Sequence, residues 1–181
     1  MEKKLSRRKI ISGFGLTGLG LLASNAQAGL TQSATLLKEG ESIQFYSSLT
    51  ELKSSSSLKA GNVVQTGGYY QSGDGGQGTY LIRTAAADLS ADGGSVITLQ
   101  KGLIAELINI SVVNYKLFGA VGDKKNDDGV QIKAAHNYAN TRRIPVINLS
   151  GEYWFRETTA IIIKTNVDWG QSVFHFDEKF N

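Results

Sequence analysis

The chain has 181 residues, of which 41% are hydrophobic and 19% charged, and its formal net charge is +3. This length and apolar content suffice to bury one core, with or without a small satellite domain, which excludes a disordered tail. Five of the 19 basic residues but only one of the 16 acidic residues lie in residues 1–28, so the rest of the chain carries a charge of about −1. We therefore expect no nucleic-acid partner.

Residues 1–28 have the three zones of an export signal. A basic start is followed by an apolar stretch over 10–23 and by the small-residue site that contains Ala26 and Ala28. The run around Arg7 and Arg8 resembles the twin-arginine motif. We expect cleavage after Ala28, the twin-arginine translocase as a partner during export, and a periplasmic or secreted location. An ordinary secretory signal or an uncleaved anchor is the alternative.

Composition also limits membrane and metal chemistry. The apolar stretch is shorter than the roughly 20 residues that a bilayer core requires, so we expect no stable membrane anchor. The chain has no cysteine, which excludes disulfides and thiolate metal sites. Its two histidines, His136 and His175, lie far apart and are expected to be packing or surface residues. We expect no metal site and no cofactor.

The first elements of the mature chain are predicted to be mainly β. Residues 29–44 are small and polar, which is typical of a flexible leader. At most a brief helix is expected within 45–53, with Ser48 as its N-cap. Residues 45–111 then predict a small β-domain, because β-branched and aromatic runs alternate with glycine-rich turns. The expected strands are 63–66, 79–84, 96–99 and 103–108, the last two forming a hairpin.

A glycine-rich segment in this region matches the letter of a dinucleotide-binding motif. Gly73, Gly75 and Gly78 have the spacing of that motif, which requires a helix directly after it. Here the predicted strand 79–84 follows instead. The segment is therefore interpreted as a glycine-rich turn.

Residues 112–181 have a different pattern. A strand is expected over 112–117, a turn over 119–123, and a helix from about Asp128 to Tyr138, ending near Asn140. Asp127 or Asp128 is the expected N-cap. Short strands at spacings that suit an all-β coil are predicted at 145–149, 153–155, 160–164 and 173–176.

Several of these segments carry a family resemblance. The blocks that carry it are Phe118-Gly119-Ala120-Val121-Gly122-Asp123, Asn126-Asp127-Asp128, Ile132-Lys133-Ala134-Ala135 and Gly151-Glu152-Tyr153. In this order they resemble the N-terminal signature of the pectate-lyase-like superfamily, which includes polygalacturonase-like enzymes, rhamnogalacturonases and phage tailspike depolymerases. The resemblance covers about 112–155. It implies a right-handed parallel β-helix whose N-terminal end is covered by the helix after the two aspartates.

Some positions depart from the family pattern. Lys124 and Lys125 stand where the family usually has glycine and a hydroxyl residue, and Gly129 replaces a common threonine. These departures bear on the details of the turn. The preceding β-domain also resembles the small domain before the β-helix of some phage tailspikes, through residues 58–70 and 73–76.

The expected fold class is mainly β, with an incomplete β-helix. The expected divisions are a signal peptide at 1–28, a leader at 29–44, a small β-domain at 45–111, and the N-terminal cap with the first coils at 112–181. About thirty residues follow the cap and the first strand, enough for one or two coils, whereas a stable solenoid needs at least about three repeats.

Two groups of residues are candidates for a functional site. Asp123, Asp127 and Asp128 form an acidic cluster that could supply paired carboxylates or calcium ligands. The resemblance implies that catalytic residues lie in later coils, so we expect Asp127 and Asp128 to cap the helix and expect no catalytic residue here. Four aromatic residues could stack on sugar rings, although aromatic residues in strands are more often half-buried core. They are Tyr69, Tyr70, Tyr153 and Trp154.

The leading hypothesis is the N-terminal portion of an exported β-helix protein that degrades polysaccharide as a hydrolase or a lyase, inactive as this chain alone. The alternative is a non-catalytic envelope, attachment or carbohydrate-binding module of tailspike type, which could form a homotrimer. A degenerate product with no stable fold is a third hypothesis. The sugar, the bond, the reaction and the oligomeric state stay open.

Overall fold

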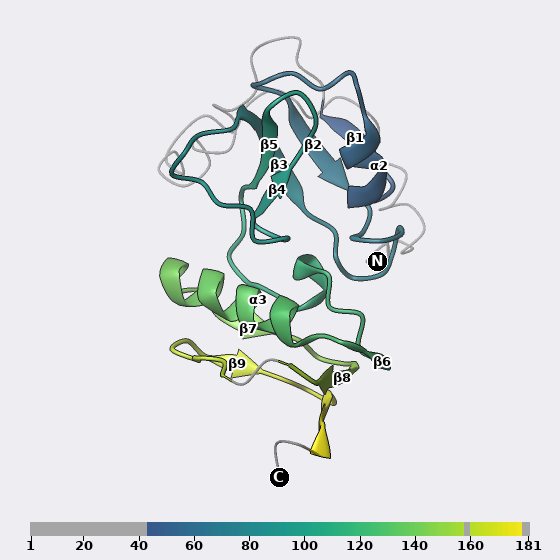
Figure 1. Cartoon of the computed structure of the whole chain (residues 1–181), viewed down its shortest axis with the longest axis vertical. Helices are drawn as coiled ribbons and strands as arrows, with labels where there is room; N and C mark the ends of the chain where they lie inside the picture. Colours follow the sequence, from purple (N-terminus) through teal and green to yellow (C-terminus); the bar gives the residue numbers. More distant parts are fainter. Residues whose placement is uncertain (1–42, 158–159, 179–181) are drawn as a thin grey trace, which may run out of the picture. The chain divides into compact units, whose positions relative to one another are not determined.

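The computed structural model describes residues 43–157 and 160–178. Within these ranges the fold is mainly β, with the strands arranged in a five-stranded, a three-stranded and a two-stranded sheet. Figure 1 shows the five-stranded sheet with the short helix α2, followed along the chain by helix α3 and the short parallel strands.

The five-stranded sheet has the strand order β1-β2-β3-β5-β4. Strand β1 pairs parallel with β2, and the other neighbours are antiparallel. The bounds match the predicted strands closely, and the predicted hairpin is confirmed as β4–β5. The elements are β1 Gln44–Tyr46, α2 Leu49–Ser54, β2 Val63–Thr66, β3 Thr79–Thr84, β4 Val96–Thr98 and β5 Leu103–Leu107.

Local sequence explains how this sheet is covered. Alternation along β3 buries Tyr80 and Ile82, as expected for a strand with one face in a core. Helix α2 places Leu49 and Leu52, one turn apart, against that core. The predicted N-cap is confirmed, since the Ser48 hydroxyl accepts a hydrogen bond from the Glu51 N–H at 3.2 Å.

The glycine-rich segment between β2 and β3 is a turn organised by one carboxylate. Asp74 accepts hydrogen bonds from the backbone N–H groups of Tyr69, Tyr70, Gln71 and Gly76, at 2.7–3.1 Å. Burial alone would raise the pKa of Asp74, but these four hydrogen bonds lower it. The segment leads directly into β3, as the sequence predicted.

The remaining elements begin with a short 3-10 helix, η3. Their bounds are η3 Lys116–Phe118, β6 Asp123–Asp127, α3 Gly129–Arg142, β7 Val146–Ile147, β8 Glu152–Phe155, β9 Val167–Asp168 and β10 Val173–Phe176. Strands β10, β8 and β6 form one parallel sheet, and β7 and β9 form another. An isolated parallel bridge between Val113 and Val146 extends the second sheet.

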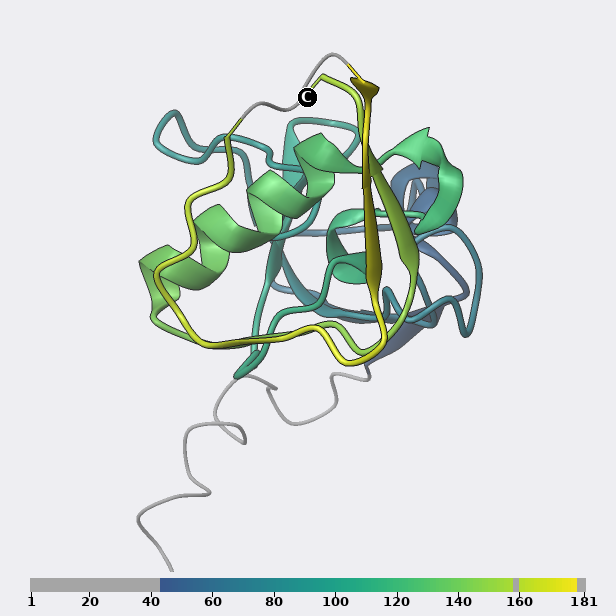
Figure 2. The same ribbon diagram turned by 90° about the horizontal axis from the view of Figure 1, so that it is seen from below.

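The connectivity of these strands is that of a coil. The chain passes through β7 and β8 and then repeats the path through β9 and β10, with β9 beside β7 and β10 beside β8. Figure 2 shows β8 and β10 running side by side. Tyr153, Phe155 and Phe174 point into this coil, where their rings contact one another or Tyr115. Parallel pairing of successive turns defines the β-helix type of architecture.

Helix α3 packs against η3, β7 and β8. Its buried residues recur every three or four positions and form one stripe, as expected for a helix with one face in a core. They are Gly129, Ile132, Ala135, His136 and Ala139. Buried side chains of the five-stranded sheet and of the coil belong to one continuous core.

Two predicted strands are wrong. Over 112–117 the only pairing is the bridge at Val113, because the Asn114 carboxamide oxygen accepts the Leu117 N–H at 2.7 Å and closes the tight turn of η3. Over 160–164 there is no strand, because the backbone of this segment is hydrogen-bonded to the side chain of Asn140 on α3. The Asn140 Nδ2 donates to the Ile162 carbonyl, and its Oδ1 accepts the Lys164 N–H.

Two other boundaries also differ from expectation. Strand β6 lies where a turn and polar residues were expected, and it pairs with β8 only at Asp123 and Asp127, with an irregularity between them. Helix α3 continues two residues beyond Asn140, to Arg142, and ends with Arg143 in the left-handed conformation, whose N–H donates to the Ala139 carbonyl.

We predict that Gly76→Ala destabilises the fold by about 1–3 kcal/mol. A Cβ at this position would lie 2.5 Å from the Lys116 carbonyl oxygen and 2.6 Å from the Tyr69 Cβ, so the turn would have to move. Urea denaturation measures the loss. The neighbouring exposed Gln77→Ala is the control and should change the free energy of unfolding by less than about 0.5 kcal/mol; equal effects would contradict the prediction.

Candidate functional site

Several predicted functional residues cannot be placed. Arg7 and Arg8 of the signal motif, and Ala26 and Ala28 of the cleavage site, lie outside the described residues. Among the described residues, no helix is long and apolar enough to cross a membrane.

The aspartate pair joins three segments. Asp128 occupies the N-cap position of α3, but its side chain makes no capping hydrogen bond. Its buried carboxylate instead accepts the N–H groups of Val121 and Gly122, at 2.6 and 3.0 Å. Burial raises the pKa of Asp128, although these hydrogen bonds oppose the shift. The carboxylate therefore holds the turn before the helix.

Asp127 has the role nearest to a helix cap. Its Oδ1 accepts the N–H of Gly129, the first residue of α3, at 3.0 Å. The same carboxylate accepts the N–H groups of Arg156 and Glu157, at 3.3 and 3.2 Å, and so connects α3 to the segment after β8. Both carboxylates therefore accept hydrogen bonds from backbone N–H groups.

Tyr153 is fully buried, so its ring cannot stack on a sugar in this structure. Its hydroxyl donates to the Ser150 carbonyl at 3.0 Å and is hydrogen-bonded to the buried Asn148 side chain. Burial raises the pKa of Tyr153. This candidate sugar contact is a core residue because the alternation of β8 points it into the coil.

Trp154, the next residue, lies on the outer face of the β10-β8-β6 sheet. It is half-buried, and the Arg156 guanidinium lies 4.6 Å from its ring centroid, which covers part of its surface. His175 occupies the paired position on β10. Trp154 and His175 line a hollow of about 380 Å³ together with Lys124, Phe176, Asp177 and Glu178.

A small polar cluster crosses the same face. Glu152 on β8 lies 3.1 Å from His175 Nε2 on β10 and 3.8 Å from Lys124 Nζ on β6. All three side chains are partly or largely exposed, so this cluster contributes little to stability. It nevertheless places ionisable groups of three strands next to Trp154.

Tyr69 and Tyr70 lie together on the glycine-rich turn. Their ring centroids are 4.7 Å apart, in an edge-to-face arrangement. Tyr69 is partly buried, and its hydroxyl donates to the Gly93 carbonyl at 2.8 Å. Tyr70 is 52% exposed, and its hydroxyl donates to the Gly119 carbonyl at 2.8 Å. Of the four aromatic candidates, Tyr70 has the most accessible ring.

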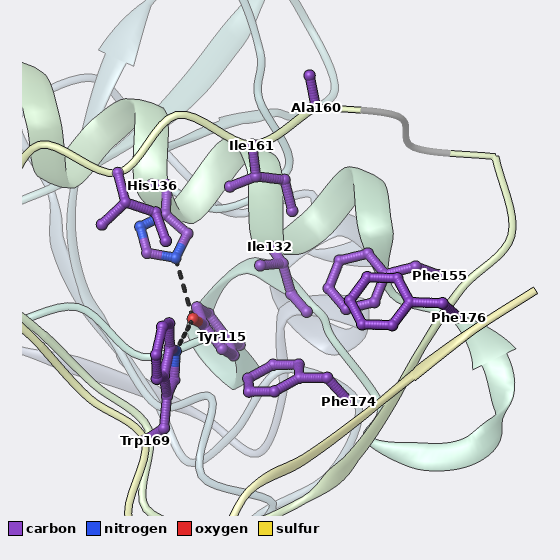
Figure 3. A pocket seen from close by; sticks show the side chains of 10 residues that line it. Tyr115, Ile132, His136, Phe155, Ala160, Ile161, Trp169, Phe174 and Phe176 are labelled. Atoms are coloured by element: carbon purple, nitrogen blue, oxygen red, sulfur yellow. Dashed lines mark hydrogen bonds between the residues drawn. The ribbon is translucent and has the colours of Figure 1, made fainter. Parts of the chain in front are cut away.

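A second hollow, of about 300 Å³, lies at the side of the coil formed by β9 and β10 (Figure 3). Its lining is mostly apolar, and its polar atoms belong to Tyr115, His136 and Trp169. Trp169 Nε1 donates to the Tyr115 hydroxyl at 2.8 Å, and that hydroxyl lies 3.0 Å from His136 Nε2. No local motif in the sequence indicated this group, because its members come from three distant segments.

The hydrogen bonds indicate the protonation of His136. Since the Tyr115 hydroxyl accepts from Trp169, its own proton is available to His136 Nε2, which leaves the ring proton on Nδ1. Burial lowers the pKa of His136, so the ring is neutral at neutral pH. Its Nδ1 is buried and has no hydrogen-bond partner among the described residues.

These sites differ in the chemistry that they can support. Within residues 43–157 and 160–178, no group of three or more histidine, aspartate or glutamate side chains is placed to hold a metal ion. The Asp127–Asp128 carboxylates are engaged with backbone. What the described surfaces offer is accessible aromatic rings beside polar groups, which suits binding.

Comparison with solved structures identifies the fold. The chain is similar to WceF of Pantoea stewartii, a glycan biofilm modifying enzyme with a bacteriophage tailspike-like parallel β-helix fold, at 16% identity over 63% of this chain, with a TM-score of 0.50. It is also similar to the tailspike protein gp49 of the Acinetobacter baumannii bacteriophage Fri1, a capsular polysaccharide depolymerase, at 19% identity over 70% of this chain, with a TM-score of 0.52.

These similarities support the predicted β-helix fold and extend no further than the fold. The chain spans only 17% of the length of WceF and 22% of that of gp49. No family model matches the chain, and no curated protein is similar to it in sequence.

We predict that the free energy of unfolding decreases as the pH falls below about 6.5. The pKa of His136 is depressed in the fold, so the unfolded chain takes up a proton there that the folded chain does not. Urea denaturation over a pH series measures this slope. His136→Asn, which removes this ionisable group, should flatten the slope. An unchanged slope in His136→Asn would refute the assignment.

Proposed function

We propose that this chain is the N-terminal part of an exported β-helix protein that acts on polysaccharide, as a hydrolase or a lyase, and that the chain by itself is inactive. In this proposal residues 1–28 are a twin-arginine signal peptide, residues 29–44 a leader, and residues 45–111 a small β-domain. Residues 112–181 form the cap and the first coils.

The observation that carries the proposal is the open side of the last coil. Among the described residues, β9 pairs only with β7, and β10 only with β8. Large apolar side chains are exposed there. They are Ile162, Ile163, Trp169, Val173 and Phe176, whose exposed fractions range from 42% to 61%. Unpaired strand edges with apolar neighbours favour another β-strand layer, which further coils would supply.

The polysaccharide class rests on the two solved structures. WceF is a glycan biofilm modifying enzyme and gp49 is a capsular polysaccharide depolymerase, and both are several times longer than this chain. A protein built on the same fold, with catalytic residues in later coils, would leave the first coils without a catalytic group. The absence of a catalytic group from the first coils is consistent with the carboxylates of Asp127 and Asp128, which accept hydrogen bonds from backbone N–H groups.

Export is proposed from the sequence. Arg7 and Arg8 precede a mildly apolar stretch and the Ala26-Gln27-Ala28 site, and the lack of cysteine fits a protein that folds without disulfides. The proposed location is the periplasm or the exterior, with the twin-arginine translocase as the export partner.

A non-catalytic attachment module is the second candidate. The observation that favours it is the exposed ring of Tyr70, whose hydroxyl donates a hydrogen bond to the Gly119 carbonyl. Such a module could assemble as a homotrimer, in which subunit contacts would cover the apolar side of the coil.

We predict that the exported product has a mass well above 19.5 kDa. An antibody against residues 29–181 would detect it in a fractionated cell, and mass spectrometry would give its intact mass. A mass equal to that of residues 29–181 would contradict the enzyme proposal and favour the attachment module.

We also predict that the 181-residue chain releases no reducing ends or unsaturated products from acidic polysaccharides, whereas the longer exported product does. The matched comparison is the two proteins at equal molar concentration on the same substrates. Product release by the short chain would refute the inactivity of this part, and release by neither would refute the enzyme proposal.

A further inference from the structure

A hollow of about 450 Å³ lies beside Tyr70, and the proposed function gives it no role. It is lined by Tyr70, Gln71, Asp74, Lys116, Ala120 and Val121. We infer that this hollow binds a neutral pyranose unit of a polysaccharide, with the sugar ring stacked on Tyr70. The inference takes its ligand class from the proposed function but concerns a site whose lining lies wholly within the described residues.

The first step is that the Tyr70 ring is held rigidly although it is exposed. Its hydroxyl is bonded to the Gly119 carbonyl, and Tyr69 contacts it edge-to-face. Tyr69 is itself fixed by its bond to the Gly93 carbonyl. Because the ring is already ordered, little conformational entropy is lost when a ligand stacks on it.

The second step is that the backbone under the ring is also fixed. The two Asp74 oxygens each accept two backbone N–H groups, which fills their hydrogen-bonding capacity. Asn114 Nδ2 donates to the Gly75 carbonyl at 3.1 Å and ties the turn to the segment before η3. Asp74 therefore shapes the hollow and is not itself a ligand group.

The third step concerns the polar groups that remain at the hollow. Lys116 Nζ donates to the Val121 carbonyl, which places an ammonium group with further donors at the wall. Gln71 is exposed, and its carboxamide can both donate and accept. Sugar hydroxyls, which also donate and accept, match this set.

The charges of the lining favour a neutral ligand. The hollow is lined by one carboxylate, Asp74, and one ammonium group, Lys116, whose charges balance. The negative face of an aromatic ring attracts the slightly positive C–H groups of a pyranose.

The test is a ¹H–¹⁵N NMR titration of the 181-residue chain with cellohexaose, maltohexaose and laminarihexaose. We expect at least one of these glucans to shift the amides of Tyr70, Gln71, Lys116, Ala120 and Val121 as a group. No shift there with any of the three, or shifts confined to another surface, would overturn the inference.

Variants make the test specific. Tyr70→Ala should weaken binding about tenfold, the scale of one lost aromatic contact, and Gln71→Ala several-fold. Tyr70→Phe keeps the ring and should retain most of the affinity. Phe45→Ala removes another exposed ring, at 64% exposure on β1, and should leave binding unchanged. An unaltered spectrum outside the hollow shows that each variant folds.

Equal binding by Tyr70→Ala and the parent chain, or equal losses in Tyr70→Ala and Phe45→Ala, would refute a site at Tyr70. The result is independent of catalysis. If glucans bind at the hollow but the longer protein releases no product, the binding site is supported and the enzyme proposal is refuted. If the longer protein releases product but no glucan binds at the hollow, the enzyme proposal is supported and the binding site is refuted.

Discussion

The buried carboxylate of Asp128 is the interaction on which the coil-forming part of the structure depends. It accepts the N–H groups of Val121 and Gly122, while the Asp128 backbone N–H donates to the Trp154 carbonyl at 2.8 Å. One residue therefore joins the turn, the start of α3 and strand β8. Without a bonded acceptor, two backbone donors in this partly buried turn would lose their partner, which costs about 1–3 kcal/mol for each buried group.

Asp74 performs a similar function in the five-stranded part. A carboxylate that accepts four backbone N–H groups lets a glycine-rich segment form a defined turn without regular secondary structure. The two turns meet where the Tyr70 hydroxyl donates to the Gly119 carbonyl. The hollow beside Tyr70 is therefore a product of the contact between these two parts, and its shape depends on both carboxylates.

The coil and the hollow have opposite characters. Along the coil, the rings of Tyr153 on β8 and Phe174 on β10 stack inside, while Phe176 remains exposed, which favours further protein packing. At the hollow, the exposed ring is surrounded by polar groups that are already oriented, which favours a small polar ligand. The proposed function assigns the first surface to further coils, and the inference above assigns the second to a glycan.

The sequence by itself determined the elements whose signals are local: strands β2 and β3, the β4–β5 hairpin, the Ser48 cap and the glycine-rich turn. Only the tertiary structure decided that Tyr153 is buried, and that Asn140 ties down residues 160–164 in place of a strand. It also brought Tyr115, His136 and Trp169 together. The contacts of Asn140 and of the Tyr115 group are side-chain hydrogen bonds between residues more than twenty positions apart. The burial of Tyr153 depends on which face of its strand meets the core. Local periodicity encodes neither of these.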